Sequence, residues 1–505
     1  MAEPAARPLR RGIITVSVML ATGMQAVDTT IANVALPRIQ GSLSSSQEQM
    51  SWVLTSYIVA SAITLPLTGW VTERLGRRRV LLACILGFTL ASVLCGLAQS
   101  LPQIIAARLL QGCCGAALMP LSQALLLDIY PPEKHARAMS TWAMGITLGP
   151  IMGPVLGGWL TDHFSWRWVF LVNVPVGVLS LLGVSAFVPE SSRRRSRFDF
   201  FGFASLSIAI GGLQLLLDRG QSIDWFSSSE AWIEAGAAAL ALYMFIVHVI
   251  TTRQEPFVDP VLLRDRNFLA GILFFFVAGG VLTATLALLP QMLQGLMRLP
   301  TLDVGWIIAP RGFGALLTMV LVPWLGKRID GRYLIAAGFL VLALALWQMT
   351  QFSLLMDNSR VMYSGIMQGL GMGLVFVPIV SLTFATLSPG LRPSGSAISN
   401  LIRSLGGSVG VSVATVLLTR SERTMYSRLA DHVTPYQTGI DVVGQGLVSG
   451  QALARLDMMI ERQAAMISYT NDFKVMLVAT LCLVPVALML RPAARGDEVP
   501  VTVVD

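Results

Sequence analysis

The chain has 505 residues, of which 54% are hydrophobic and only 13% are charged, about half the charged share of a typical soluble domain. This composition excludes a soluble protein, because a soluble chain of this length needs far more polar surface. The net charge is +8 at pH 7. The basic residues lie in short loops between apolar runs, which is typical of a membrane protein and argues against nucleic-acid binding.

The first apolar run covers 12–36 and follows the basic stretch 7–11. It is too long for the hydrophobic region of a signal peptide, and it carries Asp28 and Asn33 near its end. We therefore interpret it as an uncleaved first membrane span that begins in the cytoplasm.

Apolar stretches long enough to cross a bilayer as helices recur along the rest of the chain. The predicted spans cover about 12–36, 52–72, 79–98, 101–126, 137–162, 166–187, 200–217, 231–251, 268–294, 302–325, 333–351, 358–386, 394–418 and 471–491. Lys and Arg are more frequent in the loops on the side of the N-terminus, for example in 73–79 and 193–195. With fourteen spans, both termini are therefore expected in the cytoplasm.

One long polar segment, 419–470, interrupts this series before the last span, and we expect it on the outer side. Within 452–467 the apolar residues have helical spacing, which predicts an outward extension of the last span. The segment is interpreted either as a solvated cap or as a docking surface for a partner protein.

A repeat with an offset of 257 residues divides the chain into two parallel halves. The matched residues are Pro66 with Pro323, Gly69 with Gly326, Gln111 with Gln368 and Gly112 with Gly369, and, after a one-residue insertion, Pro120 with Pro378 and Pro131 with Pro389. Two six-helix halves, 12–187 and 268–491, and two inserted helices in 188–251 account for fourteen spans. The prediction is an all-α membrane protein with a transporter architecture.

Two charged residues within the first half are the main candidates for energy coupling, because charge inside a bilayer is costly. Asp28 lies in the first span, and Thr285 stands at the matching position of the second half. A carboxyl group in an apolar surrounding can take up and release protons near neutral pH, so we predict that Asp28 carries the proton. A carboxylate that is permanently paired or hydrated is the alternative. Arg108 in the fourth span is its expected partner, either for proton movement or as a structural tie.

The substrate pocket is expected to be apolar, with a few polar groups from both halves near the middle of the membrane. Arg311 and Arg403 are cations within spans of the second half, and no acid within those spans is expected to match them. We interpret them either as ligands for anionic substrate groups or as ties to backbone carbonyls. The candidate substrate-binding residues are Gln25, Asn33, Gln123, Gln291, Gln294, Arg311, Asn400 and Arg403.

Two segments are candidates for a conformational gate. The short turn 69–79 has clustered charge, which suits either a latch that forms and breaks or a plain topological anchor. The run 145–158 has small residues at four-residue spacing and two prolines, which predicts a tightly packed, bent helix. The candidate gate residues are Gly69, Glu73, Arg74, Gly76, Arg77, Gly149, Pro150, Gly153, Pro154 and Gly157.

Other kinds of chemistry find no support in the sequence. The five cysteines lie in apolar runs without CxxC spacing, and the four histidines are scattered, so we expect neither a metal site nor disulfide chemistry. There is no GxxxxGK[ST] motif for a nucleotide and no catalytic cluster. We expect a transporter, not an enzyme, that uses the proton gradient and no cofactor.

Four motifs together resemble the major facilitator superfamily, and within it the fourteen-helix drug:proton antiporter family. They are DTTIANVALP at 28–37, GWVTERLGRR at 69–78, RLLQG at 108–112 and GPIMGPVLGG at 149–158, the last being similar to the fifth-helix motif of antiporters. The loop motif of the superfamily usually has Asp where this chain has Glu73. The extra methylene keeps the charge and changes the geometry of the latch.

The segments WRWVFLVNVP at 166–175, LDRG at 217–220, DWF at 224–226 and APRG at 309–312 resemble the EmrB subfamily of multidrug efflux pumps. The resemblance implies an inner-membrane pump that exports hydrophobic drugs, antibiotics and uncouplers in exchange for protons. It also implies a tripartite system with an EmrA-type periplasmic adaptor and a TolC-like outer-membrane channel. A major facilitator transporter of one specific metabolite is the alternative, because a fold does not fix the substrate.

Overall fold

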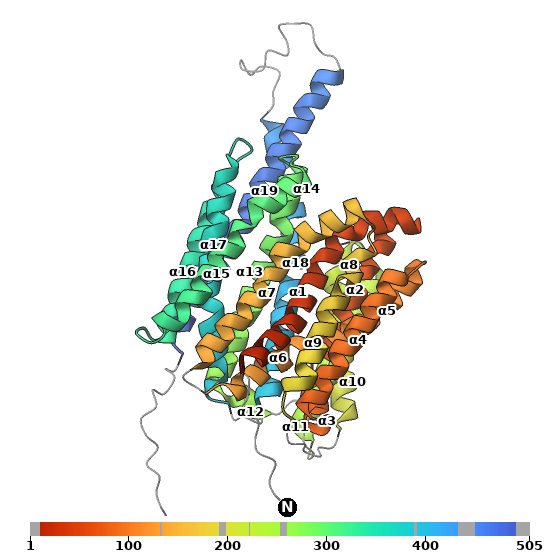
Figure 1. The fold of residues 1–505 in the computed structure, drawn as a ribbon. Coiled ribbons are helices and arrows are strands. Elements are labelled where there is room, and N and C mark those ends of the chain that lie inside the picture. The colour runs from red at the N-terminus through yellow and green to blue at the C-terminus, as the bar shows by residue number, and fades with distance from the viewer. Residues whose placement is uncertain are drawn as a thin grey trace, which may run out of the picture.

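The computed structural model describes residues 11–131, 134–190, 198–221, 223–252, 260–387, 391–432 and 450–490, and every regular element in them is a helix (Figure 1). The basic stretches 7–10 and 193–195 and the repeat residue Pro389 lie outside these ranges. The helices are α1 (Arg11–Leu43), α2 (Gln47–Thr64), α3 (Leu67–Leu75), α4 (Arg77–Leu97), α5 (Leu101–Gly115), α6 (Leu118–Ile129), α7 (His135–His163), α8 (Trp168–Leu171), α9 (Asn173–Phe187), α10 (Phe200–Arg219), η2 (Trp225–Ser227), α11 (Ser229–Thr251), α12 (Pro260–Arg264), α13 (Arg266–Gly295), α14 (Thr301–Ile308), α15 (Pro310–Leu325), α16 (Gly331–Met349), α17 (Asn358–Ala385), α18 (Arg392–Asp431) and α19 (Gly450–Leu488).

The predicted spans correspond to these helices in chain order. Among the described residues, twelve helical segments are long and apolar enough to cross a membrane, and the pair α2 and α3 makes a thirteenth. That pair bends by 57° at Pro66, whose ring prevents the regular hydrogen bonding of a straight helix. The 29-residue helix α7 covers the remaining predicted span, 137–162.

The helices form two groups that stand side by side (Figure 1). In the first group α1 packs against α7 and α9, and α2 packs against α5. In the second group α13 packs against α18, and α17 packs against α15 and α16. The helices α10 and α11 pack on each other, and α10 contacts both α2 and α18. We call the end of the bundle where α1 begins and α19 ends the terminal face.

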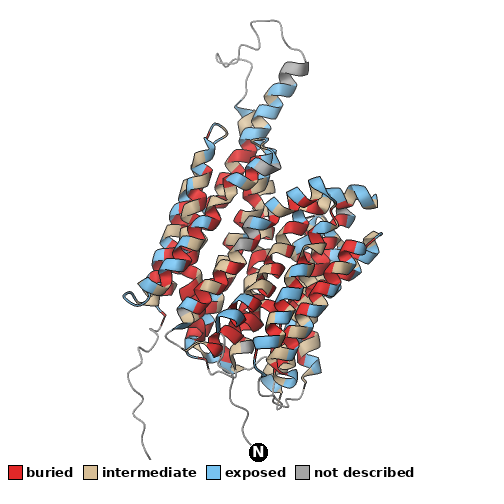
Figure 2. Ribbon diagram, viewed as in Figure 1, coloured by how far each residue is buried: buried red, intermediate tan, exposed pale blue. Residues whose placement is uncertain are grey.

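Many large apolar side chains are exposed. Exposed positions, in pale blue, alternate along the helices with the buried positions, in red (Figure 2). Leu182, Ile250 and Phe313 are each more than half exposed. Such a surface is costly in water and suits the hydrocarbon of a bilayer. The outward side chains therefore indicate a membrane-spanning bundle, as the composition predicts.

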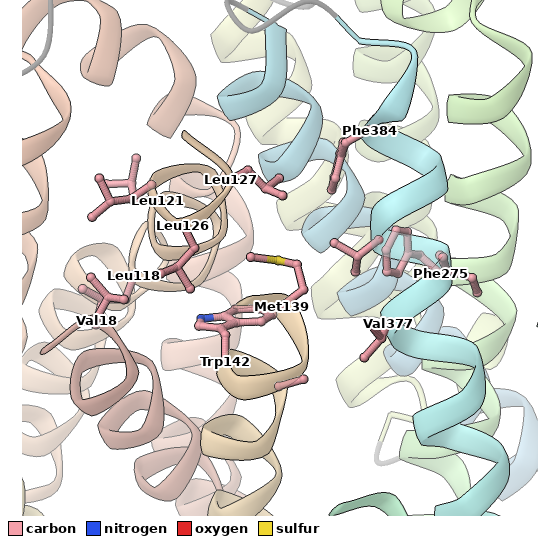
Figure 3. Packing of buried hydrophobic residues seen from close by; sticks show 14 of the residues in the cluster. Val18, Leu118, Leu121, Leu126, Leu127, Met139, Trp142, Phe275, Val377 and Phe384 are labelled. Atoms are coloured by element: carbon pink, nitrogen blue, oxygen red, sulfur yellow. The ribbon is translucent and has the colours of Figure 1, made fainter. Parts of the chain in front are cut away.

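The two groups meet through a shared apolar core near the terminal face (Figure 3). The ring of Trp142 in α7 lies 6.4 Å from that of Phe376 in α17, and Thr147 Oγ1 is 3.7 Å from Met319 Sδ. The hydroxyl of Ser140 donates to the carbonyl of Met319. The ends of α7, α15 and α17 that lie near the terminal face therefore hold the two groups together.

The helices α18 and α19 rise beyond the rest of the bundle at the opposite end (Figure 1). Helix continues past the predicted span 394–418 to Asp431, and α19 begins at Gly450, well before the predicted span 471–491. The predicted helical segment 452–467 lies within α19. Tyr426 donates to Asp457 Oδ1 at 2.6 Å, and Asn471 donates to Ser421 Oγ at 3.2 Å, so cross-helix hydrogen bonds tie this extension together.

Candidate functional site

The first helix group holds a buried ion pair between α1 and α5. The Nη1 of Arg108 lies 2.6 Å from Oδ2 of Asp28, and the two side chains are 1% and 0% exposed. The sequence left open whether these two residues pair, and the structure places them in direct contact. Because both charges are removed from water, each needs the other to offset the cost of its burial.

Amide side chains complete the coordination of the Asp28 carboxylate. Gln111 Nε2 and Asn173 Nδ2 each donate to Oδ1 at 2.8 Å. The same Gln111 accepts from Arg108 Nη1 at 2.8 Å, so the amide bridges the acid and the base. Ser92 Oγ accepts from both amides, at 3.3 Å from Gln111 and 3.0 Å from Asn173. Helices α1, α4, α5 and α9 therefore meet in one polar network.

The guanidinium of Arg108 also contacts residues of α2 and α8. Its Nε donates to the carbonyl of Val53 at 3.2 Å, and its centre lies 4.3 Å from the ring centroid of Tyr57 and 5.8 Å from that of Phe170. Stacking on aromatic faces stabilises a cation that is shielded from water. The acid on α1, the carbonyl on α2 and the aromatic rings therefore hold the guanidinium in one position, and the ion pair joins α1 to α5.

Sequence reasoning found Asp28 and Arg108 because charged residues stand out in apolar spans. It missed the roles of Asn173 and Ser92. The available signal for Asn173 was an amide within the predicted span 166–187, whereas a serine such as Ser92 is common in membrane helices and carries no comparable signal.

Three of the predicted substrate-binding residues come together where α6 meets α18. Gln123 Oε1 accepts from Ser396 Oγ at 2.7 Å and from Asn400 Nδ2 at 3.1 Å. Arg403 Nη2 donates to Asn400 Oδ1 at 3.3 Å and approaches Met119 Sδ at 3.5 Å. These contacts place a polar cluster between the two helix groups.

The other predicted substrate-binding residues lie apart from this cluster. Gln25 is buried in α1, and Arg311 is buried in α15. Asn33 of α1 and Gln291 and Gln294 of α13 are exposed. The eight residues therefore do not form one compact set, because they occupy different depths and faces of their helices.

The predicted gate residues in 69–77, which belong to α3, to the turn at Gly76 and to the start of α4, lie at the terminal face. A Cβ at Gly69 would lie only 2.6 Å from Ser394 Oγ of the second group, so α3 and α18 approach closely.

The charged gate residues make contacts within the first group. Arg77 forms an ion pair with Asp128, and Arg74 lies 5.2 Å from the ring centroid of Trp70. Gly76 has φ 90°, which allows the sharp turn into α4, and Glu73 is half-buried near the end of α3.

The glycine-rich run of α7 packs directly on α1. A Cβ at Gly149 would lie 2.6 Å from Ala26 Cβ, and one at Gly157 would lie 2.9 Å from Ile31 Cγ1. A Cβ at Gly153 would overlap Thr30, whose Oγ1 donates to the Gly149 carbonyl at 3.1 Å. Small residues therefore bring the two backbones together. The gate candidates Pro150 and Pro154 lie in α7, and their side chains are outside the described part.

The second group contains a buried acid that sequence reasoning overlooked. Asp472 of α19 is 2% exposed, and its Oδ2 has no hydrogen-bond partner among the described residues. Sequence reasoning did not count this acid among the second-half spans. Among the described residues it forms no hydrogen bond with Arg311, whose Nη1 and Nη2 have no partner either. The signal was available, because Asp472 stands near the start of the predicted span 471–491.

Comparisons with known proteins agree with this architecture. The family model described as Major Facilitator Superfamily matches residues 18–411. Among solved structures, the human organic anion transporter MFSD10 has a TM-score of 0.59 at 16% identity, with 94% of this chain and 100% of that chain covered. A bacterial homologue of the lysosomal transporter Spinster has a TM-score of 0.53 at 16% identity, with 96% and 98% covered. These two structures support the fold alone.

Full-length relatives define the group more narrowly. The fatty acid resistance protein FarB of Neisseria gonorrhoeae is 35% identical over 486 residues, covering 95% of this chain and 96% of the relative. The multidrug export protein EmrB of Escherichia coli K12 is 36% identical over 472 residues, covering 91% of both.

The helical bundle, with its buried charge network and apolar outer surface, is a multi-pass membrane transporter and not an enzyme. The chain belongs to the Major Facilitator Superfamily, in its fourteen-helix drug:proton antiporter group.

Proposed function

We propose that this protein is a proton-coupled antiporter that exports hydrophobic drugs and other toxic amphipathic compounds from a bacterium. Relatives that match over nine-tenths of the chain are named for multidrug export and fatty acid resistance. The observation that carries the proton step is the buried pair of Asp28 and Arg108 where α1 meets α5. This pair is charged, shielded from water and connected to four helices.

The network supports a direct coupling mechanism. With Asp28 ionised, its carboxylate holds Arg108, Gln111 and Asn173 and so ties α1 to α5 and α9. A proton on Asp28 cancels the charge that the guanidinium faces and weakens these contacts. The helix α1 is then released, and its close contact with α7 transmits the change to the interface between the two helix groups.

The proposed location is the bacterial inner membrane, with both termini in the cytoplasm. Arg74 and Arg77 lie at the terminal face, and a basic face is expected on the cytoplasmic side. In this orientation the groups are joined at the cytoplasmic face, and the extension formed by α18 and α19 projects into the periplasm.

Export is tested with purified protein in liposomes that enclose a fluorescent hydrophobic cation such as ethidium. An imposed proton gradient should drive ethidium uphill, and collapse of the gradient with an ionophore should stop it. Uphill movement that persists without a proton gradient would exclude proton coupling. The same liposomes show whether ethidium moves in the direction opposite to the protons, as an antiporter requires.

The transporter of one specific metabolite remains the alternative within this fold. The deletion strain distinguishes it, because a multidrug exporter protects cells against several chemically unrelated hydrophobic toxins. We expect the strain to lose tolerance to more than one of them and to regain it with the gene restored. Unchanged tolerance to every toxin in the panel would favour the single-metabolite transporter.

We also propose that the pump works in a tripartite assembly with an EmrA-type periplasmic adaptor and a TolC-like outer-membrane channel. The exposed tip of the α18 and α19 extension is a suitable docking surface, because it stands clear of the bundle. A photo-crosslinking residue at Met459, on this tip, should capture the adaptor in cells. The same residue at Leu355, an exposed site between α16 and α17, should not. Equal capture at both sites would contradict docking at the extension.

A further inference from the structure

The second helix group contains a counterpart of the Asp28 network in which the acid is missing. Gln368 lies 257 residues after Gln111, and Thr285 lies 257 residues after Asp28. Gln368 Nε2 donates to Thr285 Oγ1 at 3.2 Å, just as Gln111 donates to Asp28 at 2.8 Å. The repeat therefore preserves the amide and replaces the carboxylate by a neutral hydroxyl.

A cation is nevertheless buried at this place. Arg311 of α15 is 8% exposed, and neither Nη1 nor Nη2 has a hydrogen-bond partner among the described residues. Arg108, in contrast, is held by an acid, an amide, a carbonyl and two aromatic rings. Burial of a guanidinium without an opposite charge is unfavourable, so this arrangement favours binding of an anion.

The position of Arg311 is explained by a second replacement in the repeat. Gly365 stands 257 residues after Arg108, so the second half has no side chain at that position. A Cβ at Gly365 would lie 3.6 Å from Cβ of Arg311, which shows that Arg311 packs against the vacated position. The guanidinium thus enters the network from α15, the neighbouring helix, and not from α17.

Arg311 and Gln368 line a small cavity inside the second group. The cavity leaves about 10 Å³ for the centre of a water-sized molecule, which is room for about one water molecule. The remaining wall is mainly apolar and includes Val281, Phe339, Leu342 and Met372. The cavity wall contains one cation, Arg311, and the cavity has little room for water. The cavity therefore suits a small monovalent anion better than a phosphate dianion.

We propose that this cavity, which we call the Arg311 site, binds a carboxylate-sized monovalent anion through both Nη groups of Arg311, and that the flexible side chain of Met372 moves aside to enlarge the space beyond that of one water molecule. The planar guanidinium matches the two oxygens of a carboxylate, which makes paired hydrogen bonds. Gln368 Oε1 is an acceptor, so the guanidinium and not the amide positions the anion. The occupant is either a free small anion or the head group of an amphipathic acid. The latter case rests on the proposed export of amphipathic compounds.

Direct binding to the full-length protein in lipid nanodiscs tests the Arg311 site without any proton gradient, so its outcome is independent of the export assay. Calorimetric titrations would use acetate, chloride and decanoate, with decyltrimethylammonium as a cation of similar length. We expect Arg311→Gln to weaken anion binding by about tenfold or more. Arg360→Gln, at an exposed position in the first turn of α17, should bind anions as the wild type does.

A second variant supplies the missing charge within the protein. Gly365→Asp has room for its Cβ and places a carboxyl group beside Arg311. It should raise the melting temperature and abolish anion binding by occupying the site. Decanoate binding that acetate and chloride cannot displace identifies an amphipathic acid, whereas equal binding of acetate or chloride identifies a free anion. Unchanged anion affinity in folded Arg311→Gln or Gly365→Asp would overturn the proposal.

Discussion

Asp28 and Arg108 form a buried ion pair, and a permanently charged pair in an apolar interior is a poor source of stability, which is why we propose that the pair serves to respond to a proton. Desolvation of two ions offsets much of their attraction, whereas removal of one partner leaves the other charge exposed to an apolar surrounding. The surrounding amides of Gln111 and Asn173 make the ionised state tolerable. The site is thus stable with the charges present and sensitive to their loss.

This argument predicts unequal effects of single and double substitutions. Asp28→Asn and Arg108→Gln should each lower the free energy of unfolding by roughly 3–5 kcal/mol, because each leaves a buried charge without its partner. The double variant should be more stable than the sum of the two losses implies. Thermal unfolding in detergent measures all three. Losses that add without any coupling would contradict a direct pair.

At this scale the sequence predicts the ionised residues and not their amide partners. Asp28 and Arg108 are conspicuous because charge is rare inside spans. The roles of Asn173 and Ser92 depend on the packing of α4 and α9 against α1, which no local pattern specifies. Asp472 was recognisable as an acid near a span boundary, yet only the packed structure places it in the interior.

The pair of helices α1 and α7 shows how an element-level pattern becomes a contact. The glycine spacing in α7 predicts a close crossing, and the structure identifies α1 as the partner. Backbone atoms of Ala26 lie where a side chain at Gly149 would stand. A rigid neighbour of this kind cannot move aside as a flexible side chain can.

Gly149→Ala should therefore destabilise the protein by roughly 1–3 kcal/mol through overpacking, since its Cβ would lie 2.7 Å from the Ala26 carbonyl carbon. Gly158→Ala in the same helix is the matched control, because no atom lies within 4 Å of its added Cβ. That control should be neutral or gain up to about 1 kcal/mol from the higher helix propensity of alanine. Equal melting temperatures for the two variants would exclude a tight crossing at Gly149.

The membrane-spanning helices could be predicted from apolar length, and their outward extensions only in part. Hydropathy ends the span before α18 does, because 419–431 is polar. Helical spacing still revealed the beginning of α19, since apolar residues there pack at helical intervals. Polar residues on both extensions hydrogen-bond across the pair, as Tyr426 does with Asp457, and this is a tertiary contact that hydropathy does not record.

At the scale of the whole molecule, the joined terminal face defines one of the states that an alternating transporter must adopt. Gly69 and Ser394 belong to different helix groups and touch at this face. If the groups must separate here during transport, a covalent link between them should stop export.

The variant Gly69→Cys with Ser394→Cys tests this motion in a protein without the five native cysteines. The two Cβ atoms would lie about 3.4 Å apart, close enough for a disulfide. Oxidation should stop export in liposomes, and reduction should restore it. Gly69→Cys alone is the control, and it should respond to neither treatment. Full export by the completely oxidised double variant would show that this face need not open.

The repeat was the part of the whole-molecule organisation that the sequence revealed best. The offset of 257 residues correctly relates the Gln111–Asp28 contact to the Gln368–Thr285 contact. The substrate pocket was not predictable in the same way. Only Gln123, Asn400 and Arg403 gather at the interface, because which polar groups meet depends on how the two groups dock.

The most direct test of proton-coupled export compares the wild type with Asp28→Asn in liposomes that carry an imposed proton gradient. Asp162→Asn is the control, because Asp162 forms an exposed ion pair with Arg38. We expect the wild type and the control to pump ethidium uphill, with rates that depend on pH. Asp28→Asn should fail to pump uphill because it has no carboxyl group to carry the proton. Uphill pumping by Asp28→Asn at the full rate and with unchanged pH dependence would contradict the assignment of Asp28 as the proton carrier.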